Sequence, residues 1–126
     1  MAHDRLGPDR DRLLVAGLDG IARRHARWGD LTEGQKTGGA AELREAAGDR
    51  ADLLAEVAGI TVGTCESKGP EYVAQGRAMA DPCRMAGADE DLIPGWIKEG
   101  KRRAEAARQK PGTLRPAALR YRSPPA

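Results

Sequence analysis

The sequence predicts an all-α protein, a small bundle of four to five short helices with a flexible basic C-terminal tail. Large apolar residues recur at steps of three and four, which is helical periodicity. The pattern is densest in residues 39–63, where one stripe contains Leu43, Ala47, Leu54, Val57 and Thr61. The length of 126 residues and the 40% apolar share fit one small domain.

The predicted core is thin. Leu, Ile and Val together number 19, and Phe is absent. A buried large side chain is worth about 1.5 to 3 kcal/mol, against an entropy cost of similar total size. A single copy would therefore be marginally stable, and a dimer or a bound partner would relieve this. The residues expected to supply the core are Leu14, Leu18, Ile21, Trp28, Leu43, Leu54, Val57, Met79, Ile93, Trp96 and Ile97.

The first helix is predicted from Pro8 or Asp9 to Trp28, after a flexible N-terminus of residues 1–8. Its apolar face includes Leu18, with acidic residues at the start and basic residues at the end, as the helix dipole favours. Gly29 ends it. His25 falls on the apolar face, and we interpret it as a partly buried packing residue, not a metal ligand or an acid–base group.

A second helix is expected to begin at Glu33, because Thr32 and Gln35 have the spacing of a capping box. The three glycines in residues 34–39 each weaken a helix by about 1 kcal/mol relative to alanine. This predicts a frayed helix or a mobile first turn leading into the central segment. The order of Lys36, Thr37 and the following glycines does not match a phosphate-binding loop.

Within the central segment, the pattern predicts two helices, about 40–47 and about 50–62, that meet at Gly48. Asp49 is expected to cap the second of them, and Asp52 sits at a favourable helix start. A single kinked helix is the alternative.

Beyond the central segment, residues 65–69 are predicted to form a loop, and Pro70 to open a short helix through Ala80. Asp81 and Pro82 would interrupt that helix and leave residues 83–86 as a separate turn closed by Gly87. The last helix is predicted from Asp89 through Ala104, with a start that is kinked or delayed at Pro94.

No residue pattern indicates a catalytic, metal or cofactor site, so a non-enzymatic protein is favoured. Residues 89–91 are all acidic, but neighbours on a helix point in different directions, and a solvated helix start explains them. A zinc site lacks paired-ligand spacing among His3, His25, Cys65 and Cys83. The two serines have no base near them in the sequence.

The two cysteines are expected to be free buried thiols, because a lone pair of intracellular cysteines rarely forms a disulfide. The chain has no apolar run near the roughly 20 residues that a membrane span needs, and its start lacks a signal peptide. We therefore expect a cytoplasmic protein without a membrane partner.

Charge is segregated along the chain. Residues 1–97 carry 12 Lys and Arg against 17 Asp and Glu, whereas residues 98–126 carry 9 against 2. The helical domain is assigned to residues 9–109, and residues 110–126 are predicted to be a disordered, proline-containing tail. The candidate nucleic-acid-binding residues are Lys101, Arg102, Arg103, Arg108, Lys110, Arg115, Arg120 and Arg122. Such residues can neutralise phosphates, or they can simply complement the helix dipole and keep the chain soluble.

Three segments resemble small helical proteins of actinobacteria, some of them carried on mobile genetic elements. The segments are RWGDLT (27–32), AELREAAGDRADLLAEVAG (41–59) and AGADEDLIPGWIKEGKRRAEAARQ (86–109). That group has no established activity, so the resemblance implies a helical fold and transfers no site residue.

The leading functional hypothesis is a non-enzymatic helical interaction or adaptor module that forms a homodimer or binds a protein partner. It follows from the thin core and from apolar stripes without site chemistry. The alternative is a nucleic-acid-associated accessory protein that uses the basic C-terminal end.

Overall fold

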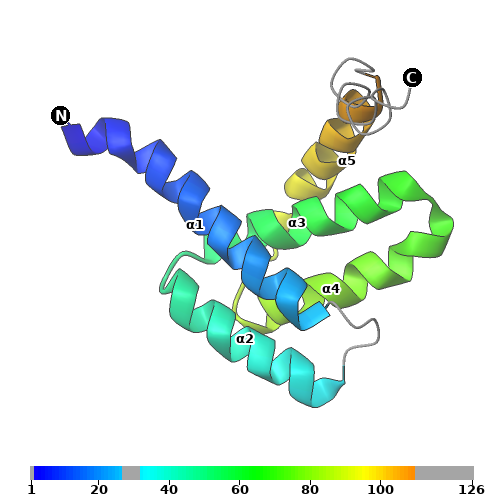
Figure 1. Ribbon diagram of the computed structural model, residues 1–126, viewed down its shortest axis with the longest axis horizontal. Helices are drawn as coiled ribbons and strands as arrows, with labels where there is room; N and C mark the ends of the chain where they lie inside the picture. Colours follow the sequence, from blue (N-terminus) through cyan, green and yellow to red (C-terminus); the bar gives the residue numbers. More distant parts are fainter. Residues whose placement is uncertain (1, 27–31, 110–126) are drawn as a thin grey trace, which may run out of the picture.

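The periodic apolar residues lie on α-helices, as predicted. The structure is a computed structural model that describes residues 2–26 and 32–109, and within them it contains no strand. The helices are α1 (Ala2–Ala26), α2 (Glu33–Ala47), α3 (Ala51–Lys68), α4 (Val73–Met85) and α5 (Ile93–Gln109), with a 3-10 turn, η1 (Pro70–Tyr72), before α4. Figure 1 shows their arrangement. The all-α prediction is confirmed.

Helix α3 is the centre of the fold, since it packs against α1, α4 and α5, and most extensively against α5. Every helix contributes at least one buried side chain to a single core. The largest or most buried of these are Leu18, Leu43, Leu54, Cys83 and Ile93. Alanines such as Ala55 and Ala58 fill the spaces between them. The core therefore has few large side chains, as the composition predicted.

Most of the predicted core residues are buried or packed against the core. Val57 is buried with those named above, and four others are partly buried against the core: Leu14, Ile21, Trp96 and Ile97. Met79 is half-buried and lies outside the core cluster. Trp28 lies outside the described residues. Leu53 and Val62 are buried as well, although the sequence had not singled them out as core.

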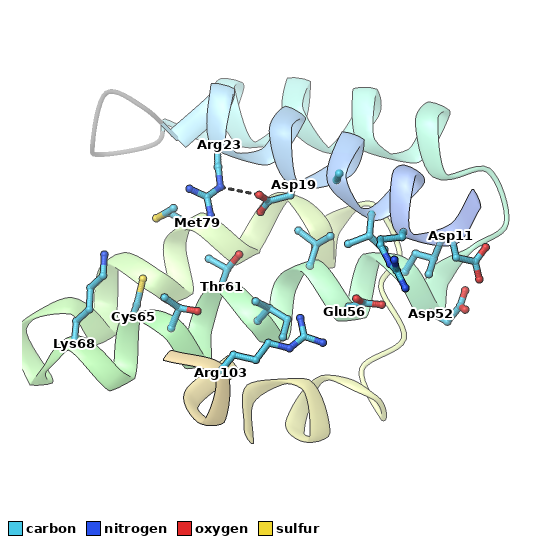
Figure 2. Close-up of a pocket in the computed structure, with 17 residues that line it drawn as sticks. Asp11, Asp19, Arg23, Asp52, Glu56, Thr61, Cys65, Lys68, Met79 and Arg103 are labelled. Atoms are coloured by element: carbon cyan, nitrogen blue, oxygen red, sulfur yellow. Dashed lines mark hydrogen bonds and ion pairs between the residues drawn. The ribbon is translucent and has the colours of Figure 1, made fainter. Parts of the chain in front are cut away.

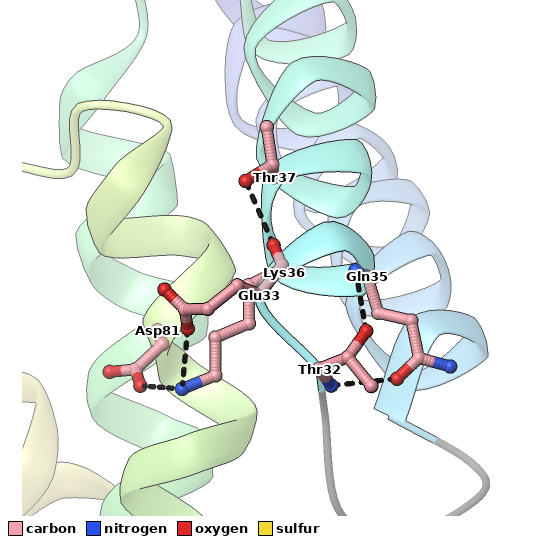
Figure 3. A network of polar contacts seen from close by, with 6 residues as sticks. All are labelled: Thr32, Glu33, Gln35, Lys36, Thr37 and Asp81. Atoms are coloured by element: carbon pink, nitrogen blue, oxygen red, sulfur yellow. Dashed lines mark hydrogen bonds and ion pairs between the residues drawn. The ribbon is translucent and has the colours of Figure 1, made fainter.

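The predicted start of α2 is confirmed. The Oγ1 of Thr32 accepts a hydrogen bond from the Gln35 N–H at 3.1 Å, and the Gln35 Oε1 accepts one from the Thr32 N–H at 2.8 Å (Figure 3). This reciprocal pair is a capping box, which satisfies two N–H groups that the helix leaves without partners. The signal is local, which is why the sequence revealed it.

The prediction of a frayed segment after Glu33 is wrong, because α2 is one continuous helix from Glu33 to Ala47. Tertiary contacts hold its glycine-rich turns. The Nζ of Lys36 lies 3.0 Å from a carboxylate oxygen of Asp81 on α4 (Figure 3). Gly39 is buried against the ring of His25 on α1, where a Cβ would lie 3.2 Å from Cγ.

The break at Gly48 is confirmed, and a single kinked helix is excluded. Gly48 has φ of +64°, a conformation that glycine adopts at little cost. Asp49 does not cap α3, contrary to the prediction. Arg50 occupies the cap position without a side-chain cap, and its guanidinium binds Asp11 and Asp52 instead.

Two other predicted boundaries are wrong. Residues 65–68 continue α3 and do not form a loop, because Cys65 is buried against Gly76 of α4. Helix α4 is also continuous through Pro82, where an interruption was predicted. An internal proline costs about 3 kcal/mol, but here it lies in the last turn and its ring is fully buried, which offsets the lost hydrogen bond.

Helix α5 begins at Ile93, which corresponds to the delayed start allowed by Pro94. Residues 89–92 form a turn in which the Asp89 carboxylate accepts a hydrogen bond from the Asp91 N–H at 3.1 Å. The Asp89 N–H donates to the Ala51 carbonyl at 3.1 Å. The turn therefore fixes the start of α5 beside the start of α3.

Helices α3 and α5 approach each other through three glycines. A Cβ on Gly63 would lie 2.1 Å from the Ile97 carbonyl oxygen, and one on Gly59 would lie 2.3 Å from the Trp96 Cβ. A Cβ on Gly100 would lie 2.7 Å from the Ile60 carbonyl oxygen. No side chain fits at these points, so the backbones themselves are in contact.

Helix α1 begins at Ala2, earlier than predicted, and its first turns project beyond the other helices (Figure 1). Its first described tertiary bond is the one between Asp11 and Arg50. Across residues 2–26 and 32–109, none of the helices combines the length and apolar character that a membrane crossing requires.

Candidate interaction cleft

An open cleft of about 720 Å³ lies between α1 and α5, with α3 as its floor (Figure 2). Within the described residues, α1 and α5 pack against α3 but not against each other. This leaves one side of the central helix without a covering helix.

The floor is formed by the side of α3 that borders the core. Ile60, Thr61 and Thr64 line the cleft and are each half-buried. Val57 and Cys65 line it too, and both are buried. These positions follow helical spacing. Their side chains are short or apolar and uncharged, so Glu56 is the charged residue of α3 that lines the cleft between Asp52 and Lys68.

One end of the cleft is acidic, with Asp11 of α1 and Asp52 of α3 (Figure 2). The Arg50 guanidinium lies 2.9 Å from Asp11 and 3.0 Å from Asp52. Its hydrogen bonds lower the pKa of both carboxyl groups. These two acids are therefore charged and held in place.

Glu56 lies further into the cleft and has a different environment. Burial raises the pKa of its carboxyl group, an effect that nearby Asp52 reinforces and Arg103 opposes. No described residue donates a hydrogen bond to it or forms an ion pair with it.

The opposite end of the cleft is basic. Lys68 is exposed there and lies 5.8 Å from the ring centroid of Tyr72. Arg103 lies between the two ends, on the α5 margin near Glu56 (Figure 2), where it binds Glu99 at 2.7 Å and lies 5.9 Å from the Trp96 ring centroid. Hydrogen bonds from Arg102 and Arg103 lower the pKa of Glu99 to about 2.

The wall that α1 contributes carries opposite charges two turns apart. Arg12 and Asp19 both line the cleft, with Val15 and Ala16 between them. Asp19 also forms an ion pair with Arg23 at 2.8 Å (Figure 2). Arg12 in turn lies 3.9 Å from Asp9, and exposed pairs of this kind contribute little to stability.

Four of the predicted nucleic-acid-binding residues lie in the described part of the chain, on two sides of α5. Lys101 and Arg108 face α3, where they bind Glu66 at 2.8 Å and the Ser67 hydroxyl at 2.8 Å. Arg102 and Arg103 share Glu99 on another side of α5. The remaining four lie outside the described residues: Lys110, Arg115, Arg120 and Arg122.

His25 is a packing residue between α1 and α2, as predicted. Its Nε2 lies 2.8 Å from the Glu42 carboxylate, which also binds Arg24. The bond to His25 lowers the pKa of Glu42. The ring is 25% exposed and does not reach the cleft.

Both cysteines are free and buried, which confirms that prediction. Burial raises the pKa of Cys83 to about 12. In residues 2–26 and 32–109, no three His, Cys, Asp or Glu side chains are close enough together to hold a metal ion.

The composition of α3 is one sign of the cleft that can be found in the sequence. Helix α3 is apolar or small on nearly all sides, and such a helix needs covering on every side. No known protein family, curated protein or solved structure matches this chain.

Proposed function

We propose that this protein is a non-enzymatic interaction module whose cleft binds a helical segment of a protein. The observation that carries the proposal is the uncovered side of α3, between two helices that do not touch each other. A helix laid in a groove is a common way for proteins to recognise one another.

The dimensions of the cleft support a helix as the ligand. Its lining on α3 extends from Asp52 to Lys68, which is about 24 Å at the rise of an α-helix. The short side chains of the floor allow close approach. The acidic and basic ends would fix the direction of a bound helix, because charge complementarity sets orientation and register.

Site-specific photo-crosslinking tests this proposal. A benzophenone amino acid is placed at Arg12, which is exposed on the cleft margin, and in a second protein at Glu45, which is exposed on α2 outside the cleft. After irradiation in cells, position 12 should give a discrete crosslinked polypeptide that mass spectrometry identifies, and position 45 should not. Failure to crosslink at position 12, or equal products from both positions, would contradict the proposal.

Nucleic-acid association is the second candidate, and it is favoured by the excess of basic residues in 98–126. We rank it second because the four described candidates each have a partner within the chain. Light scattering with a mixed-sequence DNA duplex, at low and high salt, tests it. A complex that salt disrupts and that is lost on truncation after Gln109 would support this function.

A further inference from the structure

We infer that the helix bound in the cleft is α1 of a second copy of this chain, so that the protein is a twofold-symmetric dimer. This inference rests on the proposed function, since it names the partner for the same cleft. Three features of α1 support it: the charges of its wall, an uncovered outer side, and its length.

The charges on the α1 wall are self-complementary. A twofold axis across α1 would place the second α1 antiparallel beside the first. Arg12 and Asp19 are two turns apart on the same wall. In the antiparallel pair, each Arg12 would face Asp19 of the other copy, with Val15 and Ala16 at the centre. A second α1 laid parallel to the first would not form both pairs.

The outer side of α1 fits the floor of the cleft. Leu13 is 74% exposed there, although it is a large apolar residue. Ala16, Gly17 and Gly20 follow it at helical spacing, all exposed, and a Cβ on either glycine would have no described neighbour within 4 Å. This slim, weakly polar side would contact Ile60, Thr61 and Thr64 of the other copy.

The length of α1 also supports the dimer. With 25 residues it is the longest of the described helices, and its first turns project beyond the other helices (Figure 1). In the dimer, two copies of α1 would lie side by side between two copies of α3. This is a four-helix bundle, in which each α3 gains the covering helix that a single copy lacks.

Charge exchange tests the inference on the full-length protein. Sedimentation equilibrium should show a dimer for the parent chain. Arg12→Glu and Asp19→Lys should each weaken the dimer about tenfold or more, because each creates two like-charged pairs across the axis. An equimolar mixture of the two variants should restore dimerisation, since the mixed dimer has both pairs with opposite charges. Glu45→Lys, an exposed change outside the cleft, should have no effect.

A second variant tests the centre of the interface. Ala16→Arg places a long charged side chain there at an exposed position of α1, so the fold should persist by circular dichroism while the dimer is lost. A parent chain that is monomeric at all concentrations, or a mixture that stays monomeric, would overturn the inference. If position 12 then crosslinked a different polypeptide, the proposed function would stand without the dimer. If position 12 gave no crosslink, both the proposed function and the dimer would be refuted.

Discussion

Replacing Gly63 with alanine tests whether the backbones of α3 and α5 are in contact. The added Cβ would lie 2.1 Å from the Ile97 carbonyl oxygen and 2.9 Å from the Lys101 nitrogen. Real Cβ contacts do not come below about 3.0 Å, so the helices would have to separate by about 0.9 Å at this point. Both neighbouring atoms belong to the backbone, so no side-chain rotation can relieve the clash.

The size of the effect follows from two opposing terms. Overpacking costs about 1 to 3 kcal/mol, and the upper value applies because the clash is with backbone. Alanine also favours the helix by about 1 kcal/mol relative to glycine. The free energy of unfolding should therefore fall by about 2 kcal/mol, which corresponds to roughly 6 to 10 °C in Tm for a domain of this size.

Thermal and urea unfolding followed by circular dichroism measure this change. The matched control is Gly38→Ala in α2, where a Cβ has no described neighbour within 4 Å. Only the helix-propensity term applies there, so this variant should be more stable than the parent by up to about 1 kcal/mol. If Gly63→Ala were as stable as the parent, the proposed backbone contact would be refuted.

Three further predictions concern the core, the cleft and a thiol. Leu54→Ala should lower the free energy of unfolding by about 2 to 5 kcal/mol in urea titrations, since this side chain is 2% exposed, whereas Leu92→Ala, at 40% exposure, should cost much less. Glu56→Gln should stabilise the protein at neutral pH and have no effect well below pH 4.5. The pKa of Glu56 is raised in the folded protein, so folding favours the protonated, uncharged carboxyl group. The stability that this preference contributes is lost as the pH rises through the folded-state pKa, and a glutamine, which is always uncharged, avoids that loss. Melting curves against pH would show this difference, and its absence at neutral pH would count against a buried carboxylate. Cys83 should resist iodoacetamide until the protein unfolds, because its pKa is about 12 and its side chain is buried; modification at equal rates in native and denatured protein would contradict this.

The features that the sequence predicted correctly are local ones. Thr32 and Gln35 form their capping box within a single turn, and Gly48 ends a helix because of its own backbone conformation. The apolar periodicity of α3 correctly identified the central helix. Each of these signals depends on residues within a few positions of one another.

The features that the sequence missed depend on contacts between distant segments. Cys65 is helical because α4 packs against it at Gly76, and the proline of α4 is tolerated because its ring is buried. The cleft depends on how far α1 lies from α5, and no local pattern encodes that separation. The ion pairs of the basic residues of α5 with Glu66 and Glu99 were also not predicted, and the nucleic-acid-binding site stays a prediction. The resemblance to actinobacterial proteins stays a prediction.

The unequal anchoring of the helices has a consequence for how the molecule opens. Helix α3 buries nine residues, whereas the side chains described for α1 include only Leu18 and Ala22 as buried. Local opening requires less free energy where fewer apolar contacts must be broken. In a single copy, amide hydrogens of α1 should therefore exchange with solvent before those of α3. The cleft thus has a rigid floor on α3, and its wall on α1 can detach with a small free-energy change. The width of the cleft is therefore set by α1.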